Sequence, residues 1–492
     1  MNPFAIVNRK LFGFSLLCSV INVSLYSQNT YSPEVLARIN KIENNLGSWF
    51  TIEGEKPSTL EARMKFHNIP GVSIAVISNY KLDFAKAYGL ADTRAKTPAT
   101  TQTLFQAASI SKSLNSMGAL KLVQQQKIDL YADINNYLVT WKFPYDSTSG
   151  GKKISLANLL SHTAGLTVHG FPGYETTAKL PSVVQVLNGI QPANTKAVRS
   201  QFAPGTRVQY SGGGTTISQL IISDVTSKPY HKYMWEEVLQ PLGMTMSFYD
   251  QPAPASKKPM LATGYKPNGT EIAGKYHVYP EQAAAGLWTN PTDLAKYIIE
   301  TQLAYQGKSA KVLNQETTRI RLKPLIDKEA ALGVFIMSKG NATYFSHGGA
   351  NEGFRCQYFG DLENGNGVVV MVNSDNGAIL NEIINSVATV YGWKDFYNPV
   401  QKKLVSVSRD ILATYVGKYE LNPGFILSVT LKGDQLITQA TNQPEFEVFP
   451  EAENIFFVKL FDAKLEFVKT GDKVDKVILH QNGTKSTAKK IE

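Results

Sequence analysis

Cysteine is nearly absent from this chain: its 492 residues contain two, Cys18 and Cys356. Cys18 lies in an N-terminal segment that we expect to be removed, which would leave Cys356 alone. The mature chain would then have no internal disulfide, so packing must hold its core together. Cys356 itself is more typical of a small packed residue than of a nucleophile.

Long apolar runs are also missing beyond the first residues. Arg9 and Lys10 precede an uncharged run over 11–25, and small and polar residues follow around Ser27. This order is typical of a secretory signal peptide, predicted over 1–27, and it indicates a periplasmic or secreted protein. A membrane anchor is the alternative. The run is, however, shorter than the roughly 20 apolar residues of a spanning helix, so we expect no stable membrane span after signal removal.

The charged residues and the histidines do not show the patterns of nucleic-acid-binding or metal-binding proteins. The net charge is +10, but Lys and Arg are scattered, with no basic stripe that contains aromatic residues, which argues against a nucleic-acid partner. The histidines, including His162 and His169, lack metal-ligand spacing, so we expect no metal and no cofactor. The expected partner is a small-molecule or peptide substrate, and the oligomeric state is left open.

The length favours at least two domains, since single cores rarely grow to 492 residues. Hydrophobic residues make up 43% and charged residues 18%, as in ordinary globular proteins. Periodicity and turn residues predict helices over 33–47, 109–126 and 379–391 and after Asn290, and strands over 72–78, 82–88, 332–337, 343–346, 357–360 and 368–373. This order predicts an α+β domain over 33–395, in which helices pack an antiparallel sheet completed by the terminal segments.

The composition changes after Trp393. A connector is predicted over 396–408, and short alternating runs separated by glycines follow over 409–492, including 425–431, 465–467 and 474–479. Runs of this kind predict a small antiparallel β-barrel or sandwich.

Ser109 and Lys112 place a hydroxyl and an amine three residues apart at the start of the helix predicted over 109–126. Residues with this spacing lie on one helix face, so we expect the two groups within hydrogen-bonding reach. A serine becomes a good nucleophile when a base takes its proton, and a lysine whose ammonium form is disfavoured by burial can be that base. Alone, the spacing also fits a helix cap followed by a solvated lysine.

The surrounding segments decide between these interpretations. Phe105 to Ser113, FQAASISKS, resembles the nucleophile segment of serine β-lactamases and penicillin-binding proteins. Further along, VQYSG over 208–212 is similar to the Tyr-x-Asn element of that family, with Tyr210 in place. His347-Gly348-Gly349 resembles the family's Lys-Thr-Gly strand in its histidine form.

Flanking segments over 159–166, 241–244 and 285–294 are also similar to class C type relatives. The resemblance covers roughly 33–395 and extends to class C β-lactamases, D-stereospecific aminopeptidases, DD-carboxypeptidases and related esterases. It implies the β-lactamase/transpeptidase-like fold. The C-terminal segment, from Tyr415 onward, is similar to the lipocalin-like domain of some serine peptidases of this family, where it shapes the active-site entrance; a passive packing module is the alternative.

The resemblance implies roles for six residues. Ser109 attacks a carbonyl, and Lys112 and Tyr210 act as general base and acid. His347 borders the substrate pocket, while Gly349 and Ala350 lie on the strand along the acyl group, with the amides of Ala350 and Ser109 forming an oxyanion hole. The implied enzyme is a serine hydrolase that forms an acyl-enzyme with a D-amino-acid peptide, a β-lactam or an ester.

Gly212 departs from the family pattern, because asparagine usually stands there and binds the amide of a β-lactam or peptide substrate. An esterase without β-lactam activity is therefore an alternative. A slowly acylating penicillin-binding sensor, which would bind without turnover, is an alternative of another class.

Overall fold

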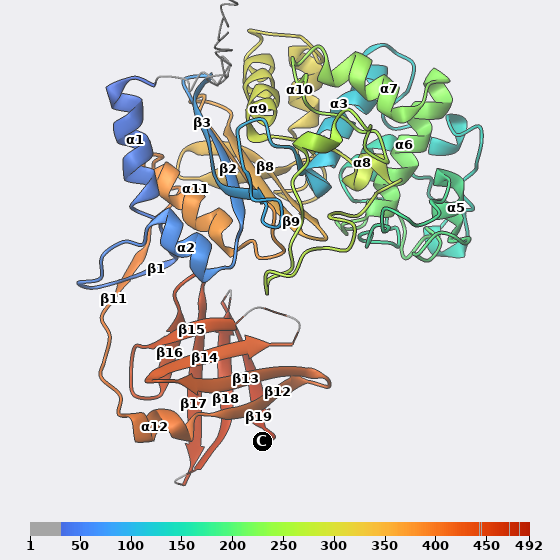
Figure 1. The fold of residues 1–492 in the computed structure, drawn as a ribbon. Helices are drawn as coiled ribbons and strands as arrows, with labels where there is room; N and C mark the ends of the chain where they lie inside the picture. Colours follow the sequence, from blue (N-terminus) through green and yellow to red (C-terminus); the bar gives the residue numbers. More distant parts are fainter. Residues whose placement is uncertain (1–30, 442, 444, 472, 482) are drawn as a thin grey trace, which may run out of the picture.

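The computed structural model of the protein describes residues 31–492 apart from 442, 444, 472 and 482. The signal peptide predicted over 1–27 lies outside these described residues. No helix within them has both the length and the apolar character needed to cross a bilayer. The described chain forms an α+β domain built on a seven-stranded sheet, and a closed β-barrel follows it (Figure 1).

The seven strands are antiparallel to their neighbours and lie in the order β4-β3-β2-β10-β9-β8-β7. The hairpin predicted over 72–88 is confirmed, and Asn79 and Tyr80 in its turn have φ values of 51° and 61°, as tight hairpin turns require. The N-terminal strand β2 pairs with the late strand β10, so the terminal segments do complete the sheet. The bounds are β2 (Gly71–Ser78), β3 (Lys81–Asp92), β4 (Thr97–Pro98), β7 (Phe335–Lys339), β8 (Ala342–Asn351), β9 (Phe354–Asp361) and β10 (Gly367–Val372).

Two apolar layers cover the sheet. Alternate side chains of a strand point to opposite faces, and in β10 Val370 packs into the layer with α1 (Pro33–Glu43), α2 (Leu60–Phe66) and α11 (Ala378–Val390). Its neighbour Val369 packs into the layer with α3 (Ser111–Gln124) and α9 (Pro291–Tyr305). Figure 1 shows these two groups of helices on opposite sides of the sheet. Burial on both faces explains the continuous apolar run of β10.

The segment between β4 and β7 contains helices joined by long irregular stretches. Its helix α9 begins where Asn290 was expected to cap it, and the Asn290 side chain accepts a hydrogen bond from the amide of Asp293. The segment also contains β5 (Phe105–Gln106) paired with β6 (Trp288–Thr289), the 3-10 turn η1 (Ala108–Ile110), α4 (Leu156–Leu160), α5 (Val183–Asn188), α6 (Gly212–Thr226), α7 (Tyr230–Met234), α8 (Gln282–Ala285) and α10 (Gln315–Arg321), besides four further short helical turns.

Helix α3 does not have the single apolar face that its sequence pattern predicts. Ser113, Asn115 and Ser116 are as fully buried as Leu114, because other elements surround the helix. Asn115 donates to Ser218 Oγ at 2.9 Å. Hydrogen bonds of this kind stabilise polar side chains inside a core, and they cannot be read from the period of the sequence.

The strand predicted over 332–337 begins three residues later, at Phe335. Gly333 has a φ of 76°, and a side chain there would press against Ser116. A residue in this left-handed conformation interrupts a strand, so 332–334 form a turn that packs on α3.

The C-terminal strands form a closed antiparallel barrel, in which each strand pairs with the next and β12 also pairs with β19. The barrel predicted from the alternating runs is therefore confirmed. Inside it, the ring of Tyr415 stacks on Phe467 at 4.3 Å between centroids. The bounds are α12 (Arg409–Thr414), β12 (Gly417–Asn422), β13 (Phe425–Lys432), β14 (Gln435–Ala440), β15 (Glu445–Pro450), β16 (Ile455–Val458), β17 (Ala463–Thr470), β18 (Lys473–Gln481) and β19 (Thr484–Lys490).

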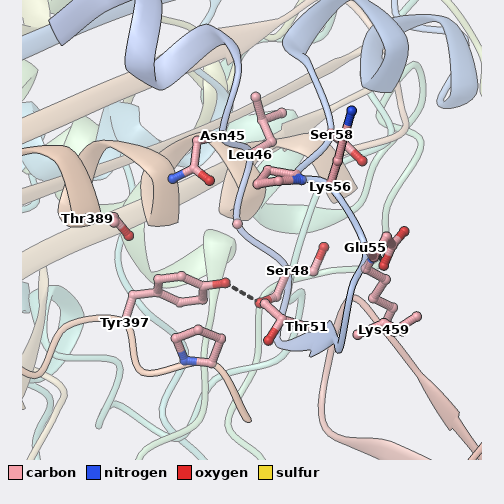
Figure 2. A pocket seen from close by; sticks show the side chains of 14 residues that line it. Asn45, Leu46, Ser48, Thr51, Glu55, Lys56, Ser58, Thr389, Tyr397 and Lys459 are labelled. Carbon is pink, nitrogen blue, oxygen red and sulfur yellow. Dashed lines mark hydrogen bonds and ion pairs between the residues drawn. The ribbon is translucent and has the colours of Figure 1, made fainter. Parts of the chain in front are cut away.

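The barrel contacts the first domain near β1 (Phe50–Ile52), which pairs in parallel with β11 (Val400–Lys402) of the predicted connector. The amide of Phe50 donates to the carbonyl of Lys459 at 3.0 Å, and its ring lies 5.1 Å from that of Phe457. A cavity of about 320 Å³ lies beside this contact, and Tyr397 in its wall donates to the carbonyl of Ser48 (Figure 2). In Figure 1 the barrel lies away from α3 and α8.

Candidate active site

The chain turns sharply at the start of α3 and presents Ser109. Ala108 has a φ of 48°, an uncommon conformation for a residue with a side chain, and η1 leads from it directly into α3. Ser109 is partly exposed whereas Ala108 and Ile110 are buried. The serine hydroxyl is thus held at a surface that a substrate can reach.

Lys112 is buried, and its amine points at the serine. Its Nζ donates to Ser109 Oγ at 3.1 Å and to the carbonyl of Ala284 in α8 at 2.7 Å. Lys112 is 4% exposed, and it makes no ion pair with any of the described residues. The amine is therefore held by neutral partners beside the nucleophile.

Tyr210 lies beside the same amine. Its ring centroid is 4.9 Å from Lys112 Nζ, and its buried hydroxyl has no hydrogen-bond partner among the described residues. Ser211, which follows it, caps α6 by accepting a hydrogen bond from the amide of Gly214. The cap fixes the backbone that carries Tyr210, so the structure brings Ser109, Lys112 and Tyr210 together.

His347 lies in β8, with its ring centroid 6.2 Å from that of Tyr210. Burial and then the charge of Lys112 lower the pKa of His347 to about 3, so the ring is neutral at neutral pH. Its Nδ1 lies 2.6 Å from the carbonyl of Gly348. A carbonyl only accepts, so Nδ1 holds the proton and Nε2 remains as a buried acceptor without a partner among the described residues.

Gly349 brings β8 against the nucleophile turn. A side chain at Gly349 would overlap the carbonyl oxygen of Ala107 and the sulfur of Cys356, and that sulfur donates to the same carbonyl at 3.2 Å. Ala350 follows and is exposed. Cys356 is buried, which raises the pKa of its thiol; a raised thiol pKa is contrary to what a nucleophilic cysteine needs.

The position of the missing asparagine is filled from another loop. A Cβ at Gly212 would lie 2.9 Å from Cε2 of Phe171 and 3.3 Å from the carbonyl oxygen of His169. The amide of Gly212 donates to that carbonyl at 3.2 Å. An aromatic ring therefore occupies the space into which a side chain at Gly212 would extend.

Sequence reasoning did not place His162 beside Tyr210; it weighed this histidine as a metal ligand. Its ring lies on that of Tyr210, with the centroids 4.2 Å apart and an angle of 38° between the planes. Phe335 stacks on Tyr210 from a third element, β7, at 6.4 Å. The segment 159–166 was known to resemble the family, but only the fold shows which of its residues contacts Tyr210.

Arg355 lies in β9, opposite Ala350 of β8. Its Nη1 lies 2.7 Å from Asp375 Oδ1 and donates to the carbonyl of Asn351 at 2.7 Å. The guanidinium therefore holds the end of the β8–β9 hairpin and already has a carboxylate partner within the chain.

Comparison with known proteins places this geometry in a family. A family model described as Beta-lactamase matches residues 58–385, which include all six predicted site residues. The chain belongs to the Beta-lactamase family. A second model, described as a domain of unknown function (DUF3471), matches residues 401–490 and so covers the barrel strands. The likeness of this barrel to lipocalins stays a prediction.

Individual relatives of this Beta-lactamase family member are distant. Penicillin-binding protein 4* of Bacillus subtilis (strain 168) is 21% identical over 82% of this chain and 91% of its own length. Protein flp of Staphylococcus aureus (strain N315) is 28% identical over 47% of this chain, and the match spans 44% of that relative, less than half its length.

Solved structures agree on the fold. The octameric penicillin-binding protein homologue from Pyrococcus abyssi has a TM-score of 0.59 at 21% identity, covering 87% of this chain and 97% of its own. The D-amino acid amidase of Ochrobactrum anthropi SV3 has a TM-score of 0.55 at 21% identity, and the match covers 72% of this chain and 98% of the amidase. The predicted β-lactamase/transpeptidase-like fold is thereby confirmed.

Proposed function

We propose that the protein is an exported serine hydrolase that forms an acyl-enzyme at Ser109. The observation that carries the proposal is the 3.1 Å hydrogen bond from Lys112 Nζ to Ser109 Oγ, with the same Nζ anchored on Ala284 and lying over the ring of Tyr210. Membership of a family of serine hydrolases supports it. Export rests on the N-terminal segment alone.

Acylation needs the proton of Ser109 to leave as its oxygen attacks. In the proposed step the proton passes to the Lys112–Tyr210 pair, Oγ bonds to the carbonyl carbon, and the carbonyl oxygen becomes an oxyanion that the amides of Ser109 and Ala350 stabilise. The pair then protonates the leaving nitrogen or oxygen as its bond to carbon breaks. An ester between Ser109 and the acyl group remains.

Deacylation uses the same pair again, with water as the nucleophile and Ser109 as the leaving group. The pair takes a proton from water, the hydroxide attacks the ester carbon, and Ser109 regains its proton as the acid product leaves. His347 and Gly349 border the acyl group in this proposal, and the neutral His347 ring offers Nε2 as a hydrogen-bond acceptor.

The proposed substrate is a small amide or ester: a D-amino-acid peptide, a β-lactam or a simple ester. The D-amino acid amidase and penicillin-binding relatives support the first two. The aromatic ring that fills the space beside Gly212 favours the alternative of an esterase without β-lactam activity, because no asparagine amide is present to bind a substrate amide.

Steady-state assays test this proposal. The wild type and Ser109→Ala are compared on p-nitrophenyl acetate, D-alanine p-nitroanilide and nitrocefin. We expect many turnovers per protein molecule on at least one substrate and none from Ser109→Ala. Release that stops at one equivalent would support the slowly acylating sensor instead, and equal rates for both proteins would contradict the proposal.

A further inference from the structure

His162 occupies an unusual backbone position next to the site. It follows α4 with a φ of 58°, the left-handed conformation that helix ends usually assign to glycine or asparagine. The turn is held by hydrogen bonds of its neighbours: Thr163 Oγ1 bonds to Ser161 Oγ at 2.9 Å and to Asn158 at 3.0 Å. A strained residue that its surroundings hold so firmly points to a role for its side chain.

His162 forms hydrogen bonds with the residues on either side of Tyr210 in the chain. The His162 carbonyl accepts a hydrogen bond from the amide of Gln209 at 2.7 Å. Its ring Nδ1 accepts one from the amide of Ser211 at 3.2 Å. The residue between these two is Tyr210, so one histidine fixes the backbone on both sides of it.

The imidazole ring also fixes the phenol itself. It lies on the Tyr210 ring with the centroids 4.2 Å apart, and Phe335 stacks on both rings, at 6.3 Å and 6.4 Å. These contacts set the plane of Tyr210 and keep it beside the amine of Lys112, which is 4.9 Å from the ring centroid.

The surroundings of His162 keep its ring neutral, with the hydrogen on Nε2. Burial and then the charge of Lys112 lower its pKa well below the usual value, so the ring is neutral. The amide of Ser211 can only donate, so Nδ1 is the unprotonated nitrogen and Nε2 holds the hydrogen. Protonation of Nδ1 would remove the acceptor that Ser211 needs.

We infer that His162 is a positioning residue, which holds the Tyr210 ring beside the amine of Lys112, the arrangement from which the proposed proton transfer starts. The inference rests on the proposed function, since it assigns Tyr210 a proton-transfer role. His162 touches no reacting atom in this scheme; it acts through Tyr210. Its removal should therefore lower kcat and leave KM nearly unchanged.

Two variants separate the two contacts. His162→Asn keeps an acceptor near the amide of Ser211 and tolerates the left-handed backbone, but it loses the ring that lies on Tyr210. His162→Phe keeps a ring and leaves the amide of Ser211 without its acceptor. The matched control is Ser227→Asn, because Ser227 also follows a helix in the left-handed conformation, with a φ of 53°, and belongs to no part of the site.

Kinetics and thermal melts on the full chain are the first test. Misplacing a catalytic group by about 1 Å can cost about 100-fold in rate, so we expect His162→Asn to lose about 10- to 100-fold in kcat, with KM within about threefold, at a temperature where the melt shows the variant fully folded. Ser227→Asn should keep the kcat of the wild type. The inference would be overturned by wild-type kcat in His162→Asn, or by a loss of kcat that disappears at temperatures where the variant is fully folded.

A crystal structure of His162→Asn tests the inference without any substrate. We expect the Tyr210 ring to move away from Lys112 Nζ, while Ser109 and Lys112 stay in place. An unmoved Tyr210 would overturn the inference even if the enzyme is active. A wild type that turns over no substrate would instead count against the proposed function, and the position of Tyr210 would still decide the role of His162.

Discussion

The ring of Phe171 and the backbone of Gly212 are in such close contact that a Cβ on Gly212 would lie 2.9 Å from Phe171 Cε2. Gly212 begins α6, two residues after Tyr210, whereas Phe171 comes from the loop between α4 and α5. A side chain at position 212 therefore requires the Phe171 ring to move.

Gly212→Asn should therefore destabilise the protein by about 1–3 kcal/mol, the usual cost of inserting atoms into a filled space. Phe171→Ala should relieve the overlap, so the double variant should be more stable than the sum of the two single changes allows. Chemical denaturation of the four proteins measures this coupling. Strict additivity of the two changes would contradict the proposed contact.

Gly349 and Gly348 provide a second comparison, on one strand. A methyl group at Gly349 would overlap the carbonyl of Ala107, which is backbone next to the nucleophile turn, whereas one at Gly348 would lie 2.6 Å from Gln357 Oε1, the end of a flexible side chain. We expect Gly349→Ala to push β8 away from Ser109 and to lower kcat at least about 10-fold, and Gly348→Ala to keep most activity. Steady-state kinetics check this order, and a larger loss in Gly348→Ala would contradict it.

Glu281 should make stability depend on pH. It is fully buried, and neither carboxylate oxygen has a hydrogen-bond partner among the described residues. Burial raises its pKa from 4.5 to about 7. The folded state therefore binds the proton more tightly than the unfolded state. The resulting contribution of Glu281 to the free energy of unfolding is up to about 3 kcal/mol; it is fully present below about pH 4.5 and is lost as the pH rises to about 7.

The variant Glu281→Gln removes this titration. We expect the wild type to lose stability relative to Glu281→Gln between pH 5 and pH 8, measured by chemical denaturation at each pH. Burial lowers the pKa of His347 to about 3, but this histidine is present in both proteins and cancels in the comparison. A stability difference that stays constant with pH would mean that Glu281 does not titrate in this range.

The barrel contact should matter for stability more than for turnover. Phe457 is fully buried and packs against Phe50 on the β1 side of the first domain, away from α3 in Figure 1. Phe457→Ala should cost about 3–5 kcal/mol and leave kcat on a small ester unchanged at temperatures where the variant is folded. A changed kcat under those conditions would favour the alternative in which the barrel shapes the active-site entrance.

Local signals explain what the sequence could predict. The hairpin of β2 and β3 follows from alternating residues and a turn at Asn79-Tyr80, and α9 follows from its Asn290 cap. The contact of Ser109 with Lys112 follows from their spacing on one helix. In each case the residues that interact are close together in the chain.

Contacts between distant segments explain what it could not predict. Nothing near His162 in the sequence indicates that its ring lies on Tyr210, and nothing near Gly212 indicates Phe171 as its neighbour. The buried polar residues of α3 have their partners in other elements, such as Ser218 in α6. The resemblance to a family supplied Tyr210 and His347, but the surroundings of each residue required the fold.

The most direct test of the account is intact-protein mass spectrometry after incubation with a fluorophosphonate, on the wild type, Ser109→Ala and Lys112→Ala. We predict one adduct per chain on the wild type, none on Ser109→Ala and much slower labelling of Lys112→Ala, because Lys112 activates the serine. Labelling of Ser109→Ala at the wild-type rate, or no labelling of the wild type, would contradict the claim that Ser109 is the nucleophile.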